Sequence, residues 1–251
     1  MSLEPGEEAT EPSPQISLIL PCYNEAEAIP YTFPQLANAF REAGHRLELI
    51  GVDNGSSDET GARLQELRDQ GSPVVPVKVE VNQGYGFGLL SGIPHARAPW
   101  IGFLPADGQV DAEDVVRLYE ALAPCRSNTM GKVRRRFRMD GPSRKLISIA
   151  YNALVWSLFP GLGSIDVNGT PKILHRETLE RMQLESKQWF LDPEILIKAY
   201  YMKVQVLEMN AFARMRGTGL SHVRASTCWE FFRQLLKFRF TGYLDPWRAS
   251  L

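Results

Sequence analysis

The first half of the chain alternates short apolar runs with longer segments in which apolar residues recur at helical spacing. The runs predict strands at Ile16–Leu20, Leu47–Val52, Val77–Val81 and Trp100–Leu104. The segments between them predict helices over about residues 30–43, 58–70, 86–97 and 111–122. This alternation is typical of an α/β fold, a mostly parallel twisted sheet flanked by helices.

Polar residues directly follow each predicted strand. The clusters are Pro21-Cys22-Tyr23-Asn24-Glu25, Asp53-Asn54-Gly55-Ser56-Ser57-Asp58, Asn82-Gln83-Gly84-Tyr85-Gly86 and Pro105-Ala106-Asp107-Gly108-Gln109. Each alone resembles an ordinary strand-to-helix turn, because Asn-Gly and Ser-Ser-Asp are good turn and capping residues. The C-terminal ends of parallel strands meet at one edge of a sheet, where such folds bind ligands. The recurrence therefore predicts one site.

Composition excludes several classes of protein. With 251 residues, 44% hydrophobic and 23% charged residues, the chain can bury a full core as a soluble globular protein. A net charge of -1 gives no signal for a nucleic-acid partner. Three scattered cysteines indicate a reducing compartment and no zinc site. No run reaches the ~20 apolar residues of a transmembrane helix and no signal peptide is visible, so we expect a cytoplasmic protein.

Charge and aromatic content divide the chain into three expected regions. Residues 1–15 carry four glutamates and no base, and predict a disordered acidic tail. Residues 16–223 form the expected α/β domain. Residues 224–251 are expected to contain an amphipathic helix and a tail.

Seven motifs in order resemble family 2 glycosyltransferases with the GT-A fold, in particular the branch of dolichyl-phosphate mannose synthase and bacterial polyprenyl-phosphate sugar transferases. The resemblance covers roughly residues 16–223. Besides the four clusters above, it rests on Asp166-Val167-Asn168-Gly169-Thr170-Pro171-Lys172, Asp192-Pro193-Glu194 and Arg216-Gly217-Thr218-Gly219-Leu220-Ser221. It implies a Rossmann-like domain that binds a nucleotide sugar, and transfer of one sugar with inversion.

The resemblance assigns the donor site to the first three strand ends and to Asp107. Carboxylates suit this task because they accept hydrogen bonds from ribose hydroxyls and from N–H groups of the base. Glycine lets the backbone approach the nucleotide closely. The residues implied are Pro21, Tyr23, Asn24, Glu25, Asp53, Asn82, Gly84 and Asp107.

The resemblance also implies a divalent cation, Mg²⁺ or Mn²⁺, held by Asp107 and Gln109 against the diphosphate. The family's motif usually begins with a further aspartate, and this chain has Pro105 there, which removes one possible ligand. Arg216 would close over the diphosphate and stabilise the departing charge. A surface arginine beside a glycine turn is the alternative interpretation of Arg216.

A basic segment supplies the implied acceptor site. Residues 126–145 hold eight lysines or arginines against one aspartate. By resemblance, Arg134, Arg144 and Ser148 bind the phosphate of a lipid acceptor, and the spacing places Arg144 and Ser148 on one side of a helix. A solvated charged face is the alternative.

Asp192 stands at the start of another predicted helix, Glu194 to Met202. It could cap that helix, or serve as a general base if the acceptor is a hydroxyl compound. A phosphate acceptor is already ionised and needs no base.

Other functions fit parts of the sequence. Gly84-Tyr85-Gly86-Phe87-Gly88 also fits a methyltransferase or dinucleotide-binding loop, although it follows the third strand and leaves the Asp53 cluster unexplained. The loss of an acid at Pro105 is compatible with a non-catalytic GT-A module. A glycosyltransferase that acts on a soluble hydroxyl acceptor is a further alternative.

The last predicted helix, residues 229–240, is rich in aromatic and basic residues. Phe232, Leu235, Leu236 and Phe240 are expected to form one apolar stripe, with Arg233 and Lys237 beside it. The stripe can pack on its own domain. It can also lie on a membrane and bring the basic segment to a lipid phosphate, which predicts peripheral membrane contact.

Overall fold

The computed structural model describes residues 13–136, 142–212 and 225–251. In this part of the chain one seven-stranded sheet has the order β3-β2-β1-β4-β6-β5-β7. The strands are β1 Ile16–Cys22, β2 Leu47–Asn54, β3 Val74–Val79, β4 Trp100–Phe103, β5 Thr129–Arg136, β6 Lys172–His175 and β7 Gln205–Phe212. β6 pairs antiparallel with β4 and β5, and the other pairs are parallel. The predicted α/β fold is confirmed.

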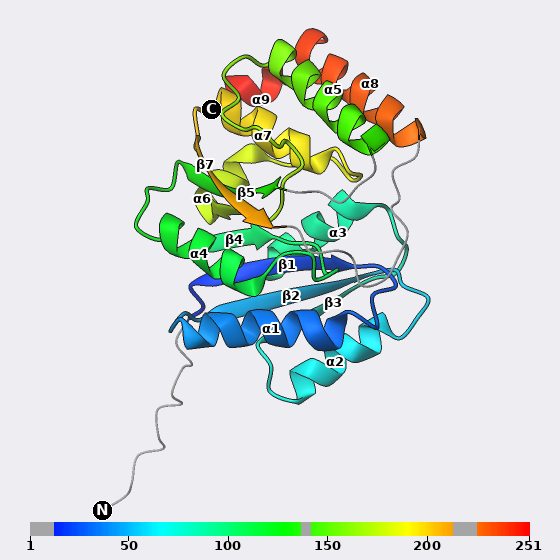
Figure 1. Cartoon of the computed structure of the whole chain (residues 1–251), viewed down its shortest axis with the longest axis vertical. Coiled ribbons are helices and arrows are strands. Elements are labelled where there is room, and N and C mark those ends of the chain that lie inside the picture. The colour runs from blue at the N-terminus through cyan, green and yellow to red at the C-terminus, as the bar shows by residue number, and fades with distance from the viewer. Residues whose placement is uncertain (1–12, 137–141, 213–224) are drawn as a thin grey trace, which may run out of the picture.

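Helices cover both faces of the sheet (Figure 1). They are α1 Ile29–Glu42, α2 Thr60–Asp69, α3 Tyr85–Gly92, the 3₁₀ turn Ile93–His95, α4 Ala112–Leu122, α5 Pro142–Leu158, α6 Arg176–Met182, α7 Leu191–Tyr201, α8 Ala225–Phe240 and α9 Asp245–Ala249. No helix within the described residues is both long and apolar enough to cross a membrane.

Two apolar cores hold these layers together, and β1 contributes to both. Leu18 and Leu20 pack in the core that includes α1, α2 and α4, whereas Ile19 packs in the core that includes α3 and α7. Successive side chains of a strand point to opposite faces, so a strand in the middle of the sheet needs apolar residues throughout. Fully burying one such side chain stabilises the fold by roughly 1.5–3 kcal/mol.

Two predicted boundaries were wrong. The third strand runs over Val74–Val79 instead of Val77–Val81, because pairing with β2 begins at Val74 opposite Leu49. Val81 is 70% exposed. The third helix ends at Gly92 and continues only as a 3₁₀ turn, in which Pro94 has no N–H to extend the helix.

The predicted apolar stripe of the last helix was also wrong. Leu235 and Phe238 are buried, and Phe231 packs against the same core. Phe232 and Phe240, expected in the stripe with Leu235, are exposed, as is Trp229. α8 therefore packs on its own domain through one face and presents aromatic residues on another.

Candidate functional site

The loops after β1 and β2 are joined by hydrogen bonds at the C-terminal edge of the sheet. Asn24, which has a positive φ of 55°, accepts at Oδ1 from the backbone N–H of Ser57 at 2.9 Å. The N–H of Asn24 donates to Ser56 Oγ at 3.1 Å. The N–H of Ser56 donates in turn to Asp53 Oδ1 at 3.0 Å. The first two predicted clusters thus form one polar surface, as the strand order requires.

Three carboxylates gather around the buried thiol of Cys22. Burial raises the pKa of Cys22 well above its ordinary value, and the charges of Glu25, Asp53 and Asp58 raise it further. Asp58 also accepts from Thr60 and Ala26 N–H groups. Burial opposes ionisation of Asp58, but the hydrogen bonds from Thr60 and Ala26 outweigh it and lower the pKa. The edge of the sheet is therefore acidic, which suits binding of hydroxyl and N–H groups.

The loop after β3 is fixed from two sides. Asn54 Nδ2 donates to the carbonyl of Gly84 at 3.0 Å, and the N–H of Gly84 donates to Asn82 Oδ1 at 2.8 Å. On the other side, a Cβ at Gly84, where φ is 117°, would lie 2.4 Å from Gln188 Oε1. The Tyr85 ring stacks on Trp189 with centroids 4.6 Å apart. The space beside Gly84 is thus occupied by residues 187–189.

The amide oxygen of Asn54 is a further polar atom at this site. Its Oδ1 is buried and has no hydrogen-bond partner in the part of the chain that the structure describes. A buried acceptor without a partner is costly, so a ligand donor at this position would be favourable.

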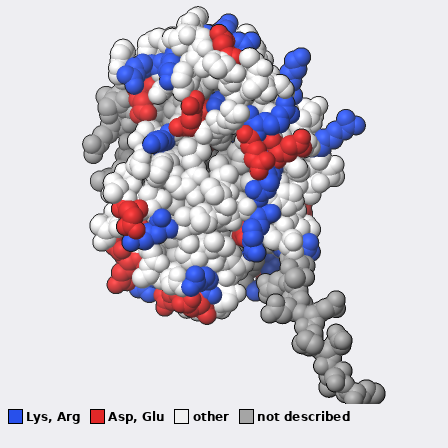
Figure 2. All heavy atoms as spheres, turned by 180° about the vertical axis from the view of Figure 1, so that it is seen from behind, with Lys and Arg blue, Asp and Glu red and all other residues white. Residues whose placement is uncertain are grey.

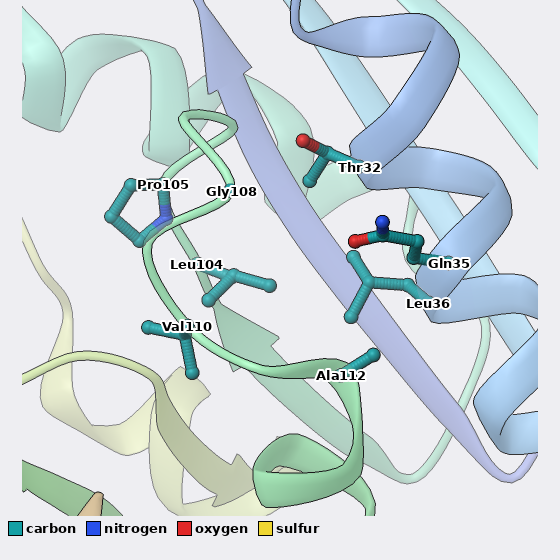
Figure 3. A pocket seen from close by; sticks show the side chains of 8 residues that line it. All are labelled: Thr32, Gln35, Leu36, Leu104, Pro105, Gly108, Val110 and Ala112. Atoms are coloured by element: carbon teal, nitrogen blue, oxygen red, sulfur yellow. The ribbon is translucent and has the colours of Figure 1, made fainter. Parts of the chain in front are cut away.

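The loop after β4 carries Asp107 and Gln109. The N–H of Gln109 donates to Asp107 Oδ1 at 3.2 Å across Gly108, whose φ is 66°. Between this loop and α1 lies a cavity of about 10 Å³, the size of roughly one water (Figure 3). Eight residues line it: Thr32, Gln35, Leu36, Leu104, Pro105, Gly108, Val110 and Ala112. This cavity is too small for a nucleotide.

Asp107 and Gln109 fit a hard divalent cation. Both offer oxygen atoms, and both are partly exposed at the edge of the sheet. Within the described residues no three His, Cys, Asp or Glu side chains form a metal-binding group. Mg²⁺ commonly takes one or two protein ligands and completes its shell with water and substrate phosphate, so this donor set is sufficient.

Three charged residues lie side by side across β6, β5 and β7, next to the end of β4. In the strand registers Phe103 lies opposite Lys172, Lys172 opposite Lys132, and Lys132 opposite Glu208. Both lysines are fully buried. Each must be compensated, because a buried charge without a partner is strongly unfavourable.

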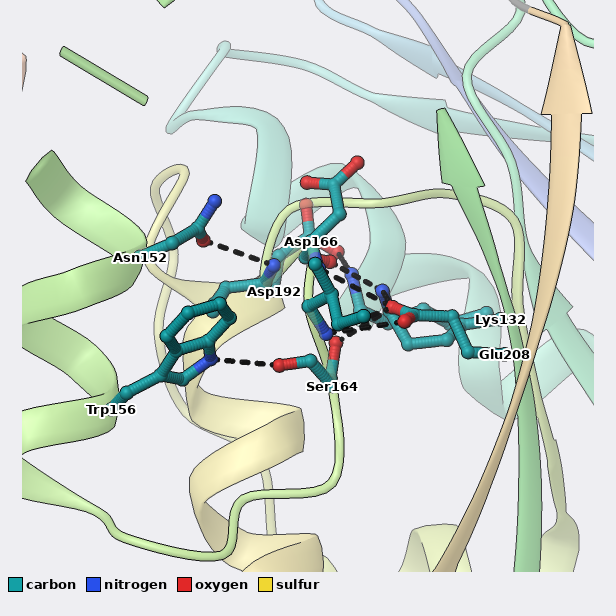
Figure 4. Close-up of polar contacts among 10 residues, drawn as sticks. Lys132, Asn152, Trp156, Ser164, Asp166, Asp192 and Glu208 are labelled. Carbon is teal, nitrogen blue, oxygen red and sulfur yellow. Dashed lines mark hydrogen bonds and ion pairs between the residues drawn. The ribbon is translucent and has the colours of Figure 1, made fainter. Parts of the chain in front are cut away.

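Glu208 compensates Lys132 (Figure 4). Lys132 Nζ lies 2.8 Å from Glu208 Oε1 and also donates to the carbonyl of Asp166. Ser164 Oγ donates to the same carboxylate oxygen at 3.0 Å. Burial opposes ionisation of Glu208, but the charge and hydrogen bond of Lys132 and the backbone N–H groups of Ile165 and Asp166 outweigh it and lower the pKa.

Asp192 compensates Lys172, and Glu194 compensates Lys198. Lys172 Nζ contacts Asp192 Oδ1, and Lys198 Nζ lies 2.7 Å from Glu194 Oε1. Burial lowers the pKa of Lys172 to about 8, the charge of Asp192 opposes this, and the charge of Lys132 adds to it. Neither acid caps α7 through its side chain. Both belong to buried ion pairs instead.

The predicted acceptor segment spans a strand and a helix. Arg134 lies on β5, opposite Asn210 of β7. Arg144 and Ser148 both lie on α5, four residues apart, as their spacing predicted. The side chains of Arg144 and Ser148 lie outside the described part, as does Arg216.

Figure 2 shows the face opposite to the view of Figure 1, with positive and negative side chains interspersed around a broad uncharged area. No single-sign surface of the kind that binds nucleic acid is visible on this face. The mixed pattern agrees with the net charge of -1.

Several site residues were not predicted from the sequence. Asn54 and Ser56 could have been found, because they stand beside Asp53 in a turn motif. Lys132 could not, since a lysine in a strand ordinarily reaches solvent. Lys172 ends the motif that begins at Asp166, but nothing in that motif predicts its burial. Trp189 carries no motif either, and its contact with Tyr85 joins residues far apart in the chain.

The comparisons with known proteins agree with this geometry. An undecaprenyl-phosphate 4-deoxy-4-formamido-L-arabinose transferase of Klebsiella pneumoniae (strain 342) is 32% identical over 145 residues, 57% of this chain and 44% of that relative. The transferase of the same name from Sodalis glossinidius (strain morsitans) is 32% identical over 142 residues, 56% of this chain and 43% of that relative. The chain thus spans less than half the length of these curated relatives.

Solved structures with the same fold cover more of the chain. Glucosyl-3-phosphoglycerate synthase from Mycobacterium tuberculosis, in complex with Mn²⁺, UDP and glucosyl-3-phosphoglycerate, has a TM-score of 0.69 at 19% identity, over 90% of this chain and 80% of that chain. The same enzyme with Mg²⁺ and UDP has a TM-score of 0.68 at 18% identity, over 90% and 79% of the two chains. The fold is therefore GT-A. Residues 17–182 match the sequence profile of glycosyl transferase family 2, and the chain belongs to this family.

Proposed function

We propose that this protein transfers one sugar from a nucleoside-diphosphate sugar to a polyprenyl phosphate, with inversion at the anomeric carbon and assistance by a divalent cation. One observation carries the proposal: in a family 2 chain, the loops bearing Asn24, Asp53 and Asp107 follow adjacent parallel strands and meet at one sheet edge. Nucleotide ligands bind at this place in open α/β sheets.

The donor nucleotide is assigned to the acidic surface of the first three loops. Asp53 and Glu25 accept from ribose and base, Tyr23 is 48% exposed and offers an aromatic face, and Pro21 and Asn24 shape the loop. Asn82 and Gly84 bound the other side. The M. tuberculosis synthase crystallised with UDP supports a nucleoside diphosphate as the ligand.

Asp107 and Gln109 would hold Mg²⁺ or Mn²⁺ at the diphosphate. When bound, the cation supplies positive charge that stabilises the departing nucleoside diphosphate. Arg216 adds a second positive charge in this proposal. The acceptor oxygen attacks the anomeric carbon from the face opposite to the leaving group, which inverts the configuration.

The ion pair of Asp192 favours an acceptor that is already ionised. A general base must be able to take the proton of the attacking hydroxyl group. Here Lys172 Nζ holds one oxygen of the Asp192 carboxylate in a buried position. A phosphate acceptor attacks through an oxygen that carries no proton, and Asp192 is not required as a base.

Arg134, Arg144 and Ser148 form the proposed acceptor phosphate site. Guanidinium groups bind phosphate in a bidentate manner, and a serine one helical turn away adds a donor. The relatives from K. pneumoniae and S. glossinidius, which are named as undecaprenyl-phosphate transferases, support a lipid phosphate.

Exposed aromatic residues near this site support peripheral contact with a membrane. α5 and α8 pack together, with the Tyr151 and Phe231 rings 5.2 Å apart, and lie side by side in Figure 1. On α8, Trp229 is 67% and Phe240 68% exposed. Together with Arg233 and Arg239, they match the composition of an interfacial helix.

A transfer assay tests the function. Labelled sugar from a panel of UDP and GDP sugars, with Mn²⁺ present, is expected to appear on undecaprenyl phosphate and to disappear when the metal is chelated. Phosphoglyceric acid, with which the M. tuberculosis synthase was crystallised, serves as a soluble acceptor for comparison. Transfer to the soluble acceptor but not to the lipid would contradict the lipid proposal, and Asp192 would then be the candidate base.

Vesicle co-sedimentation tests the membrane contact separately. The protein is expected to bind vesicles that contain anionic lipid, and less so at high salt. Trp229→Ala with Phe240→Ala should weaken this binding. Tyr31→Ala removes an aromatic residue that is 69% exposed on α1 and should not change it. Equal loss in both variants would show that the helix pair is not the contact.

A further inference from the structure

Tyr151 on α5 lies near the buried ion pair of Lys172 on β6 and Asp192 on α7, close enough for the charge of Asp192 to act on its hydroxyl group. The Lys172 ammonium contacts Oδ1 of Asp192, and both side chains are buried. Among the residues that the structure describes, Oδ2 of Asp192 accepts no hydrogen bond. This oxygen has full capacity for a donor.

The hydroxyl group of Tyr151 is the second polar group here without a hydrogen-bond partner in the described part of the chain. It is buried, and no hydrogen bond to it is found within the described residues. Burial raises the pKa of Tyr151 well above its ordinary value, and the nearby charge of Asp192 raises it further, so the hydroxyl keeps its proton. Buried polar groups in folded proteins almost always have partners, and an exception calls for a functional explanation.

The cluster lies between the proposed donor and acceptor sites. Lys172 pairs with Phe103, four residues before Asp107. Asp192 follows the loop that contains Gln188. The side chain of Gln188 donates to the carbonyl of Gln83 at 2.9 Å, in the loop after β3 that belongs to the proposed donor site. Tyr151 stands three residues after Ser148 on α5, so the two share a side of the helix. In a transferase, the sugar occupies the space between donor diphosphate and acceptor.

We propose that Tyr151 and Asp192 bind a hydroxyl group of the transferred sugar, and that Lys172 is a positioning residue that holds Asp192 in place. A sugar hydroxyl both donates and accepts. It can donate to Oδ2 of Asp192 and accept from the Tyr151 hydroxyl, which satisfies both groups at once. This inference rests on the proposed function and extends it to recognition of the sugar.

Paired binding measurements test the role of Tyr151. Affinities for UDP, UDP-glucose, GDP and GDP-mannose, with Mn²⁺ present, are measured by calorimetry for the wild type and Tyr151→Phe. The variant should lose about 3- to 10-fold in affinity for whichever nucleotide sugar the wild type binds. It should keep its affinity for the matching nucleoside diphosphate. The Tm should not fall, because the deleted hydroxyl has no hydrogen-bond partner among the described residues. Tyr200→Phe, on α7, is the matched control.

Each other outcome overturns the inference in a recognisable way. Equal loss for the diphosphate and its sugar would place Tyr151 at the nucleotide. Unchanged affinity for both, with slower transfer, would place it at the acceptor. If the wild type binds neither nucleotides nor nucleotide sugars, the proposed function fails, and the inference fails with it.

A double variant tests Asp192 and Lys172 without leaving a buried charge. Lys172→Met alone leaves Asp192 unpaired and is expected to destabilise the protein. Lys172→Met with Asp192→Leu replaces the ion pair by apolar side chains and should restore the Tm. It should still bind the nucleoside diphosphate normally and its sugar about 10-fold more weakly. Wild-type affinity for both ligands in this double variant would show that the pair is only structural.

Discussion

The two halves of the sheet present polar groups to the same edge by different means. On the donor side, β1, β2 and β3 end in loops whose side chains bond to backbone groups of neighbouring loops, as Asn24 does with Ser57. On the proposed acceptor side, β5 and β6 carry buried lysines that pair with acids, as Lys132 of β5 does with Glu208 of β7. Hydrogen bonds within turns thus fix the polar groups of the first half, and buried ion pairs fix those of the second half.

The physical cause lies in solvent exposure. Loops at the edge of the sheet remain partly in water, so short polar residues satisfy the backbone there at little cost. Lys132 and Lys172 stand on strands inside the sheet, where their charges are removed from water and require partners at fixed positions. Substitutions on the donor side should therefore affect ligands more than folding. On the acceptor side they should affect both.

The largest expected effect is on the donor side, at Asp107. Asp107→Ala should lower transfer by several orders of magnitude, because the charge of a bound metal stabilises the leaving group by several kcal/mol. The Tm without ligands should stay close to that of the wild type, since Asp107 is at a partly exposed turn. Transfer assays and thermal unfolding of the same preparation measure both quantities.

Glu113→Ala, which removes an exposed carboxylate from the first turn of α4, is the control and should transfer normally. The added stability that UDP with Mn²⁺ gives to the wild type should be lost in Asp107→Ala and retained in Glu113→Ala. Near-normal transfer by Asp107→Ala would contradict the assignment of Asp107.

The second prediction concerns the acceptor side, where Glu194 is fully buried. Glu194→Ala leaves Lys198 without its carboxylate and frees the N–H groups of Glu185 and Ser186, which donate to Glu194. The free energy of unfolding should fall by about 3–5 kcal/mol, the usual cost of breaking a buried ion pair from one side. Urea unfolding followed by circular dichroism measures it.

Glu59→Ala breaks the exposed pair between Arg63 and Glu59, which are 3.0 Å apart. Such pairs contribute about 0–1 kcal/mol, so this variant should be nearly as stable as the wild type. A similar loss of stability in the two variants would remove the distinction drawn between turns and buried ion pairs.

A third, smaller effect follows from the pKa of Lys172. Burial lowers this pKa from 10.5 to about 8, although Asp192 opposes the change. At a pH between about 8 and 10.5, Lys172 is protonated in the unfolded chain and deprotonated in the folded chain. The contribution of Lys172 to the free energy of unfolding should therefore rise as pH increases from about 8 to 10.5, by on the order of 2 kcal/mol.

Other groups also titrate in this range, so the quantity to measure is the difference between the wild type and Lys172→Met with Asp192→Leu. That difference should shift in favour of the wild type as the pH is raised. A difference that is constant, or that falls, would show that the ammonium of Lys172 is not held in a desolvated position.

The same contrast explains how much of the fold and of the candidate site can be predicted from the sequence. The strand ends of the donor half were predictable because Asp53, Asn54 and Gly55 are short-range signals, and adjacency of parallel strands does the rest. The hydrogen bonds of Asn24 with Ser56 and Ser57 of the same loop confirm that the first two clusters converge. The family resemblance supplied roles for these residues, and those roles stay predictions.

The acceptor half was less predictable because its contacts join residues distant in sequence. Lys172 and Asp192 are twenty positions apart, and Lys132 and Glu208 are seventy-six apart. No local pattern marks which lysine is buried. The stripe predicted for α8 failed for a related reason: aromatic residues stand on several sides of that helix, and only packing against α5 and α7 selects Leu235 and Phe238 for the interior.

The smallest predicted effect returns to the donor side, at Asp58. Its carboxylate accepts from the N–H of Thr60 at the start of α2 and from that of Ala26 in the preceding loop. Asp58→Ala should lower the free energy of unfolding by about 1 kcal/mol, typical for loss of an intramolecular hydrogen bond. Because these hydrogen bonds lower the pKa of Asp58, the stabilisation is present above the ordinary pKa of an aspartate and is lost as the pH falls through the lowered value. The difference between wild type and variant should accordingly vanish in acid.

Asp69→Ala at the last turn of the same helix removes a charge that opposes the helix dipole, and should leave stability unchanged or raise it slightly. A loss at Asp58 as large as that at Glu194 would mean that the donor loops are as important for folding as the buried ion pairs.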